Sequence, residues 1–259
     1  MLNNLIVVVP ARFGSSRLEG KPLADIHGVP MVVRVASLAI EALPSAYVVV
    51  ATDNDQISDV CKRNGINVLM TSPQHISGTD RIVEVRGILE AQMGNLDGKI
   101  FLNIQGDEPL IPISFVRAFA NSAVESINSG DGMFTAATPI KDVDSLLNVN
   151  VVKVVKNAQD KAMYFSRAPL CLGRAGMADV TLSPVAHLRH VGVYAYSNKL
   201  LYQWSDLPNS ITEDNEVLEQ LRVLEAGIPI GVKVFHDEIP HGVDTLEDLE
   251  HVRRIFKGM

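Results

Sequence analysis

The stretch "LIVVVPARFGSSRLEGKPL", Leu5 to Leu23, indicates the fold class of this chain. Its first part, Leu5–Val9, is apolar and β-branched, which is typical of a buried strand. The turn that follows carries Arg12, Arg17 and Lys21 beside glycines, which let a backbone turn tightly and point its N–H groups inward. Because arginine offers forked contacts and lysine a point charge, this turn suits a polyphosphate. The stretch therefore predicts a buried strand that ends at an anion-binding loop.

This loop differs from the P-loop of nucleotide-binding proteins. Five residues, rather than four, separate Gly14 from Gly20. Pro22 follows Lys21 at the position where a P-loop has the Ser or Thr that holds Mg²⁺. A metal ion bound together with the polyphosphate would need ligands from elsewhere in the chain.

The chain up to about residue 109 alternates between apolar strands and amphipathic helices. Further strands are expected at residues 46–53, 66–71 and 99–109, and helices at 31–43, 55–65 and 79–92, the last with Thr79 as its N-cap. Strands that are apolar on both faces and separated by helices favour a parallel sheet with helices on both sides. Ligands of such sheets bind beyond the carboxyl ends of the strands.

The pattern changes after about Pro109. Strands are expected at 132–140, 150–155, 161–167, 188–197 and 228–236, with helices at 212–227, between a Thr212 cap and Gly227, and at 245–256, capped by Thr245. We expect one domain, residues 1–259, in which a smaller mixed-strand insert occupies about residues 110–200.

Size and charge narrow the classes of function. The chain has 259 residues, is 47% hydrophobic and carries a net charge of −7. It has no apolar run near the roughly 20 residues that span a bilayer, and no basic stripe. Its two cysteines, Cys61 and Cys171, lie far apart and read as reduced thiols. We expect a cytoplasmic protein with no membrane and no nucleic-acid partner, which binds a small anion together with a divalent metal.

Two carboxylates are candidate metal ligands. Asp107, in "QGDEP", directly follows a strand expected to be buried, and Asp244 lies in "GVDT" before the last helix. Mg²⁺ favours one or two carboxylates together with substrate phosphates. Asp244 could equally cap the helix that follows it. Because the two residues are 137 positions apart (244 − 107), spacing leaves open whether they meet.

Each of the other candidate polar residues, taken alone, has an ordinary structural explanation. The segment "HISGTDR" could form a capped helix or could read a base or ribose through its backbone. A second set of polar residues would suit a polyhydroxylated acid, but only when its members are taken together. The set consists of Gln105, Arg167, His190, Glu219 and Gln220, and its arginine would bind the carboxylate of the acid.

Several motifs occur together, and in order, along almost the whole chain: "PARFGSSRLEGKPL", "SGTDR", "NIQGDEPLI", "AMYFSRAPL", "LRHVGVYAY", "LEQLRVLEAG" and "GVDTLEDLEHV". The chain thereby resembles the 3-deoxy-manno-octulosonate cytidylyltransferases of lipopolysaccharide synthesis. The resemblance implies an α/β fold with a Rossmann-like nucleotidyltransferase sheet, as in nucleotide-diphospho-sugar transferases, and a smaller mixed-strand dimerisation insert. It also implies a homodimer that converts CTP and 3-deoxy-manno-octulosonate (Kdo) to CMP-Kdo and pyrophosphate.

The resemblance assigns roles to residues of this chain. Catalytic roles fall to Lys21, Asp107 and Arg12, and Asp107 and Asp244 match the ligands of Mg²⁺. The residues that match the CTP site are Arg12, Ser15, Ser16, Arg17, Lys21, Ser77, Thr79 and Arg81. The residues that match the sugar-acid site are Gln105, Arg167, His190, Glu219 and Gln220.

Two positions depart from the family pattern. Glu19 and Leu246 stand where the family usually has proline. Glu19 adds negative charge beside the expected phosphate loop, whereas Leu246 affects only the start of a helix. Three alternatives stay open: the same chemistry on 8-amino-3,8-dideoxy-manno-octulosonate, the same chemistry on another sugar acid, and a nucleotide-binding regulator without turnover.

Overall fold

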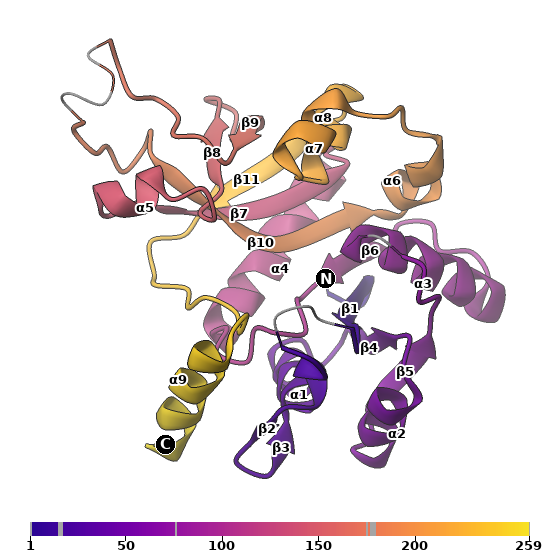
Figure 1. Cartoon of the computed structure of the whole chain (residues 1–259). Coiled ribbons are helices and arrows are strands. Elements are labelled where there is room, and N and C mark those ends of the chain that lie inside the picture. The colour runs from indigo at the N-terminus through magenta and orange to yellow at the C-terminus, as the bar shows by residue number, and fades with distance from the viewer. Residues whose placement is uncertain (1, 15–17, 76, 175, 177–179, 259) are drawn as a thin grey trace. The chain divides into compact units, whose positions relative to one another are not determined.

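The computed structural model describes residues 2–14, 18–75, 77–174, 176 and 180–258 of the chain. The chain forms two compact units (Figure 1), of which unit 1 comprises residues 1–121 and 239–259, and unit 2 residues 122–238. The expected single domain with an insert at about 110–200 stays a prediction, and each unit is described in turn.

Unit 1 contains four parallel strands in the order β6-β1-β4-β5. Their bounds are β1 Leu5–Ala11, β4 Tyr47–Thr52, β5 Asn67–Met70 and β6 Ile100–Asn103. In the central strand β1, Val8 pairs with both Val49 and Asn103, and its side chain is fully buried. The predicted parallel sheet is therefore confirmed in unit 1. Because the strand order reverses between β1 and β6, a ligand crevice is expected where these two strands end.

Helices cover the strands of unit 1 on both faces. Their bounds are α1 Met31–Ala42, α2 Asp55–Arg63 and α3 Gly78–Met93, and a fourth helix of the unit, α9 Leu246–Lys257, lies against another part of the chain. The crossovers through α1 and α2 run in one direction along the sheet and the crossover through α3 runs back. Since such crossovers are right-handed, α3 lies on the face opposite α1 and α2. Figure 1 shows the strands between them.

Two helix starts test the predicted caps. The N-cap of α3 is Ser77 rather than Thr79, because the Ser77 Oγ accepts the backbone N–H of Asp80 at 3.0 Å. Thr79 lies inside the helix and is buried. The Thr245 cap of α9 is confirmed, and Asp248 completes a capping box with it.

The C-terminal helix is packed against the first part of the chain. The short hairpin of β2 (Asp25–Ile26) and β3 (Val29–Pro30) follows the 3-10 helix η1 (Lys21–Leu23), and α9 contacts β2. One buried cluster joins these segments and consists of Ile26, Met31, Val243, Leu249 and Val252. Burial of these side chains therefore fixes the residues just before α9 beside the N-terminal part of unit 1.

Unit 2 has a mixed sheet, as expected. Its central strand β7 (Met133–Pro139) pairs with β11 (Ile230–Val234) in parallel and with β10 (Leu188–Ser197) in antiparallel orientation. Two further antiparallel strands extend from β10, namely β8 (Lys153–Lys156) and β9 (Ala162–Ser166).

The helices of unit 2 are short. They are α5 Val143–Leu147, α6 Asn198–Tyr202, η3 Trp204–Asp206, α7 Ile211–Glu216 and α8 Gln220–Glu225. The longer α4 (Ile113–Asn128) begins in unit 1 and ends in unit 2. It is absent from the predicted elements, although its buried Phe115, Phe119 and Ala123 repeat at helical spacing.

The helix predicted at 212–227 is wrong in two respects. Its N-cap is Ser210, whose Oγ accepts the backbone N–H of Glu213 at 3.0 Å, and Thr212 lies inside the first turn. The helix then breaks into α7 and α8, because Val217 adopts the left-handed conformation with φ 54° and ψ 53°. Contacts of Glu216 and Val217 with Arg167, described below, favour this break over a continuous helix.

In the part of the chain that the structure describes, no helix combines the length and the apolar character needed to cross a bilayer.

We predict that Gly106→Ala destabilises the protein by about 1–3 kcal/mol. A Cβ at residue 106 would lie 2.6 Å from the carbonyl oxygen of Pro10, in the central strand. Chemical denaturation measures the change, and Gly87→Ala is the control, because a Cβ on that exposed helical residue meets nothing within 4 Å. Equal stability of the Gly106→Ala protein and the parent would contradict the prediction.

Candidate active site

The loop after β1 is closed at its base by backbone contacts. The N–H of Gly20 donates to the carbonyl of Phe13 at 3.2 Å, and Gly20 has a left-handed φ of 63° that favours glycine. Lys21 then begins η1. Glu19 is exposed at the surface of unit 1. The predicted CTP contacts of Ser15, Ser16 and Arg17 fall on residues outside the described part of the chain.

Lys21 contacts both predicted metal ligands. Its Nζ donates to Asp107 Oδ2 at 2.6 Å, to Asp244 Oδ1 at 3.3 Å and to the carbonyl of Val243 at 2.9 Å. The Lys21 side chain is 14% exposed, whereas those of Asp107 and Asp244 are 30% and 48% exposed. The carboxyl ends of β1 and β6 thus carry a cation held between two carboxylates that a ligand can reach.

A backbone contact brings the two distant carboxylates together. The N–H of Val243 donates to the carbonyl of Asp107 at 2.8 Å. The chain packs so tightly here that a Cβ on Gly242 would lie 3.1 Å from the same carbonyl. The meeting of Asp107 and Asp244, which their spacing in the sequence leaves open, is therefore observed.

This pair of carboxylates fits a small divalent cation. The described residues contain no group of three or more His, Cys, Asp and Glu side chains that could hold a metal. The two carboxylates already bind one cation, the Lys21 ammonium, from two sides. Mg²⁺ usually takes one or two carboxylates and completes its shell with water and phosphate oxygens, so Asp107 and Asp244 could hold it.

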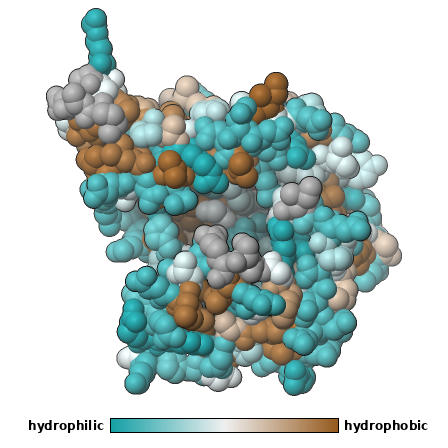
Figure 2. Space-filling view, viewed as in Figure 1, coloured by the Kyte–Doolittle hydropathy of each residue, from teal (hydrophilic) through white to brown (hydrophobic). Residues whose placement is uncertain are grey.

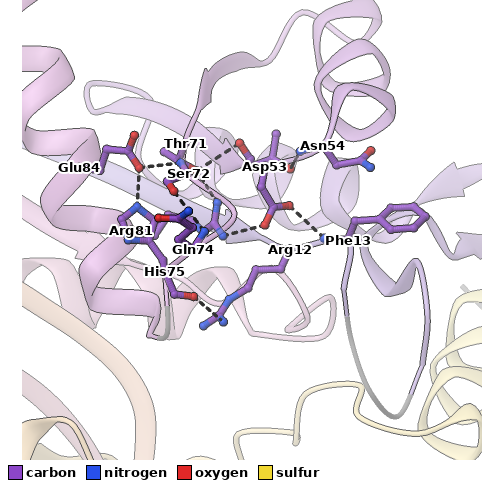
Figure 3. Close-up of polar contacts among 11 residues, drawn as sticks. Arg12, Phe13, Asp53, Asn54, Thr71, Ser72, Gln74, His75, Arg81 and Glu84 are labelled. Atoms are coloured by element: carbon purple, nitrogen blue, oxygen red, sulfur yellow. Dashed lines mark hydrogen bonds and ion pairs between the residues drawn. The ribbon is translucent and has the colours of Figure 1, made fainter.

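A buried ion pair supports the base of the loop (Figure 3). Arg81 is fully buried, and its Nη2 donates to Asp53 Oδ2 at 2.9 Å while its Nη1 donates to Thr71 Oγ1. The other oxygen of Asp53 accepts the backbone N–H of Phe13 at 3.3 Å. Asp53 therefore connects the loop after β1 to helix α3.

Arg12 makes a second link to the segment before α3. Its Nη1 donates to the carbonyl of His75 at 3.2 Å, and Figure 3 shows the guanidinium pointing toward that carbonyl. The ring of His75 contacts Glu84, which also accepts the backbone N–H of Ser72 at 2.8 Å. Sequence reasoning missed Asp53 and Glu84; the position of Asp53 at a strand end was the one available signal.

The predicted cytosine and ribose residues are gathered at the start of α3. Ser77 caps the helix, Thr79 is buried in its first turn, and Arg81 is held in the ion pair with Asp53. The side chain of Asn103 lies near Gly78. The first N–H groups of this helix form the kind of N-terminus that favours anions and polar ligand edges.

Four of the five predicted sugar-acid residues lie on neighbouring elements of unit 2, and Gln105 belongs to unit 1. The His190 ring packs edge-on against Phe165 at 5.1 Å and beside Tyr194 at 5.3 Å. The hydroxyl of Tyr194 donates to Gln220 Oε1 at 3.3 Å. The strands β9 and β10 and the helix α8 thereby place Arg167, His190, Glu219 and Gln220 in one region of unit 2.

Arg167 is held by backbone carbonyls. Its guanidinium donates to the carbonyls of Glu216, Val149 and Val217 at 2.7, 3.2 and 3.4 Å. The Glu216 carboxylate accepts the backbone N–H of Arg167 at 2.8 Å and the hydroxyl of Ser166 at 2.6 Å. Three neutral oxygens therefore orient the guanidinium, and part of its donor capacity is left for an anionic ligand.

His190 is neutral at physiological pH. Its Nε2 lies 3.0 Å from Thr135 Oγ1. Burial, reinforced by the nearby charge of Arg189, lowers the pKa of His190 to about 3. The imidazole can therefore offer a hydrogen bond at pH 7 without adding charge.

Comparisons with known proteins identify the family. A family model described as cytidylyltransferase matches residues 6–234. A 3-deoxy-manno-octulosonate cytidylyltransferase of Herminiimonas arsenicoxydans is 46% identical, over 96% of this chain and 98% of the relative. One of Neisseria meningitidis is 44% identical over 99% of each chain. The chain belongs to the 3-deoxy-manno-octulosonate cytidylyltransferase family.

A solved structure agrees with this membership. The structure of a CMP:2-keto-3-deoxy-manno-octonic acid synthetase complexed with CTP is 37% identical, with a TM-score of 0.85 and 98% of each chain covered. The predicted nucleotidyltransferase fold and the resemblance to this family are confirmed. As a member of the 3-deoxy-manno-octulosonate cytidylyltransferase family, the chain is a nucleotidyltransferase.

We predict that Asp53→Ala destabilises the protein by about 3–5 kcal/mol, because it leaves the fully buried Arg81 without its carboxylate. Chemical denaturation followed by circular dichroism measures the loss. The control is Asp59→Ala on α2, which removes an exposed carboxylate and should change stability by less than about 0.5 kcal/mol. A loss for Asp53→Ala no larger than the control's would contradict the assignment.

We predict that His190 lowers stability in mild acid. Its pKa is near 6.5 when unfolded and about 3 when folded, so below pH 6.5 the unfolded chain binds a proton that the folded chain refuses. Stability is therefore lost as pH falls from about 6.5 toward 3, by about 1 kcal/mol at pH 5.5.

The matched variant is His190→Gln, whose stability should fall by about 1 kcal/mol less than the parent's between about pH 7.5 and 5.5. In the parent, the His190 ring signals in NMR spectra should stay constant from about pH 8 to 5. A titration of these signals near pH 6.5 would refute the neutral assignment.

Proposed function

We propose that this chain transfers CMP from CTP to the anomeric 2-hydroxyl of Kdo, with release of pyrophosphate, for lipopolysaccharide synthesis. The observation that carries the proposal is the Lys21–Asp107–Asp244 cluster at the carboxyl ends of β1 and β6. In such a cluster, a lysine that can bind phosphate lies beside two carboxylates that can bind a metal ion. The names of the relatives supply the substrates.

Lys21 and Arg12 would stabilise the triphosphate. Both lie at the base of the loop after β1, where charge develops on the phosphates in the transition state. Cations fixed at such a point are usually the largest single contribution to catalysis. Ser15, Ser16 and Arg17 would complete the phosphate contacts, and the start of α3, from Ser77 to Arg81, would lie near cytosine and ribose.

Asp107 and Asp244 would hold Mg²⁺. When bound, the metal would polarise the α-phosphate and lower the pKa of the attacking sugar hydroxyl. The hydroxyl would attack the phosphorus in line, which breaks the bond to pyrophosphate. No covalent intermediate with the protein is needed, because the sugar oxygen itself is the nucleophile.

The sugar acid would bind through residues with complementary chemistry. Arg167 would hold the carboxylate, because its guanidinium contacts only carbonyl oxygens in the described part of the chain. His190, Glu219 and Gln220 would bind the hydroxyl groups, and the same role for Gln105 stays a prediction. The neutral imidazole of His190 suits this task, because a charged imidazolium would have to lose its bound water before a sugar hydroxyl could take its place.

We also propose a cytoplasmic homodimer. Cys61 is a buried free thiol and Cys171 an exposed one, which suits a reducing compartment. Unit 2 exposes large apolar side chains, among them Val149, Met163 and Val185, and Figure 2 shows apolar patches on a mostly hydrophilic face. Light scattering on the purified protein tests the dimer, and a mass of 28.2 kDa, that of one chain, would refute it.

The exact sugar is the finer question. Asp214 is exposed on α7 and lies close in sequence to Glu219, one of the predicted sugar-acid residues. An extra carboxylate there suits an ammonium group, as on 8-amino-3,8-dideoxy-manno-octulosonate. The ratio of kcat/KM for the two sugars decides between them, and a clear preference for Kdo would remove this alternative.

We predict that the protein releases pyrophosphate from CTP only when Mg²⁺ and Kdo are both present. Asp107→Asn should lower kcat by about a hundredfold or more, because it removes one of the two carboxylates proposed to hold the metal at the reacting phosphate. Asp59→Asn, on the exposed face of α2, is the control and should leave kcat unchanged. Absence of release with any 3-deoxy sugar acid would favour a nucleotide-binding regulator, and near-parental activity of Asp107→Asn would refute the metal assignment.

A further inference from the structure

The Lys21 ammonium is fully engaged by the two proposed metal ligands. It has three N–H donors, and the structure gives it three acceptors: Asp107 Oδ2, Asp244 Oδ1 and the Val243 carbonyl. The side chain is mostly buried. Lys21 therefore has no donor left for a phosphate while it stays in this arrangement.

The same arrangement excludes a metal ion. Mg²⁺ binds carboxylate oxygens at about 2.0–2.1 Å. To be held by both Asp107 and Asp244, it has to lie between the oxygens that the two carboxylates direct toward each other. The ammonium lies 2.6 Å from Asp107 Oδ2 and 3.3 Å from Asp244 Oδ1, on the side where both carboxylates converge. Two cations would repel strongly at such a separation, so the ammonium and the metal compete for one place.

The lysine is the partner that can move. The backbone of Asp107 is tied by the bond from the Val243 N–H to its carbonyl, and the backbone N–H of Asp244 donates to Asp248 Oδ2 at 3.0 Å, so both carboxylates extend on short side chains from a fixed backbone. Lys21 instead reaches the carboxylates through a flexible four-carbon stem from the short helix η1. Its ammonium can turn toward a phosphate without any movement of the two carboxylates.

We propose that Lys21 is an exchangeable counter-ion that keeps metal out of the carboxylate pair until the triphosphate of CTP draws the ammonium away. This inference rests on the proposed function, in which Asp107 and Asp244 hold the metal and Lys21 holds phosphate. CTP supplies a more highly charged acceptor for Lys21 and additional oxygen ligands for the metal. Nucleotide and metal thereby bind with positive coupling, and each raises the affinity for the other.

The test measures metal binding alone. Protein free of nucleotide is titrated with Mn²⁺, and electron paramagnetic resonance counts the unbound ion. Lys21→Gln should bind Mn²⁺ at least about tenfold more tightly than the parent, a size typical of coupling between sites. Lys62→Gln, an exposed lysine on α2, is the control for loss of one positive charge and should leave the affinity unchanged.

Two further conditions separate direct occupancy from general charge. The tightening should persist at about 0.5 M KCl, where interactions between separated charges are screened. Lys21→Arg, which keeps a cation able to contact both carboxylates, should bind Mn²⁺ as weakly as the parent. Unchanged affinity of Lys21→Gln, loss of the gain in high salt, or equal tightening in Lys21→Arg would each overturn the proposal.

A measurement on the unaltered protein covers the case in which Lys21→Gln does not fold. NMR spectra of ¹⁵N-labelled lysine side chains should contain an ammonium signal that Lys21→Arg lacks, and CTP without metal should shift it. A shift of equal size with about 10 mM Mg²⁺ alone would overturn the proposal. This outcome is distinct from a failure of the proposed function, which would appear as absence of pyrophosphate release from the unaltered enzyme.

Discussion

One backbone hydrogen bond determines whether the candidate site exists. The Val243 N–H meets the Asp107 carbonyl, and this contact puts a residue near the C-terminus beside the turn after β6. The buried cluster of α9, the β2 hairpin and Val243 holds the bond in place. Everything proposed for metal, phosphate and Lys21 depends on this junction, because it brings the two carboxylates that contact the Lys21 ammonium to one place.

The fold of unit 1 was largely predictable from local patterns. Strands such as Leu5–Ala11 are apolar on both faces, and the helices Met31–Ala42 and Asp55–Arg63 have clear amphipathic spacing, so the identities of these elements follow from periodicity. Unit 2 was less predictable. The break at Val217 depends on contacts that Arg167 makes with the carbonyls of Glu216 and Val217, and a local pattern contains no such information.

The candidate site was predictable as a set of residues rather than as a geometry. Cations after the first strand and Asp107 after a buried strand are visible in the sequence, and the family motifs add Asp244 and the sugar-acid set. The Asp53–Arg81 pair was missed, because a buried arginine inside a helix looks like any other charged residue in a sequence. Long-range pairs of this kind are decided by tertiary packing, which spacing along the chain does not encode.

The position of Asp244 couples the cation site to the packing of the C-terminal helix. Asp244 directly precedes α9 (Leu246–Lys257), whose Leu249 and Val252 are buried in one cluster with Ile26 and Met31. The side chains that hold Asp244 beside Asp107 are therefore also part of the hydrophobic core of unit 1. A substitution that loosens α9 would act on the cation site and on the stability of the fold at the same time.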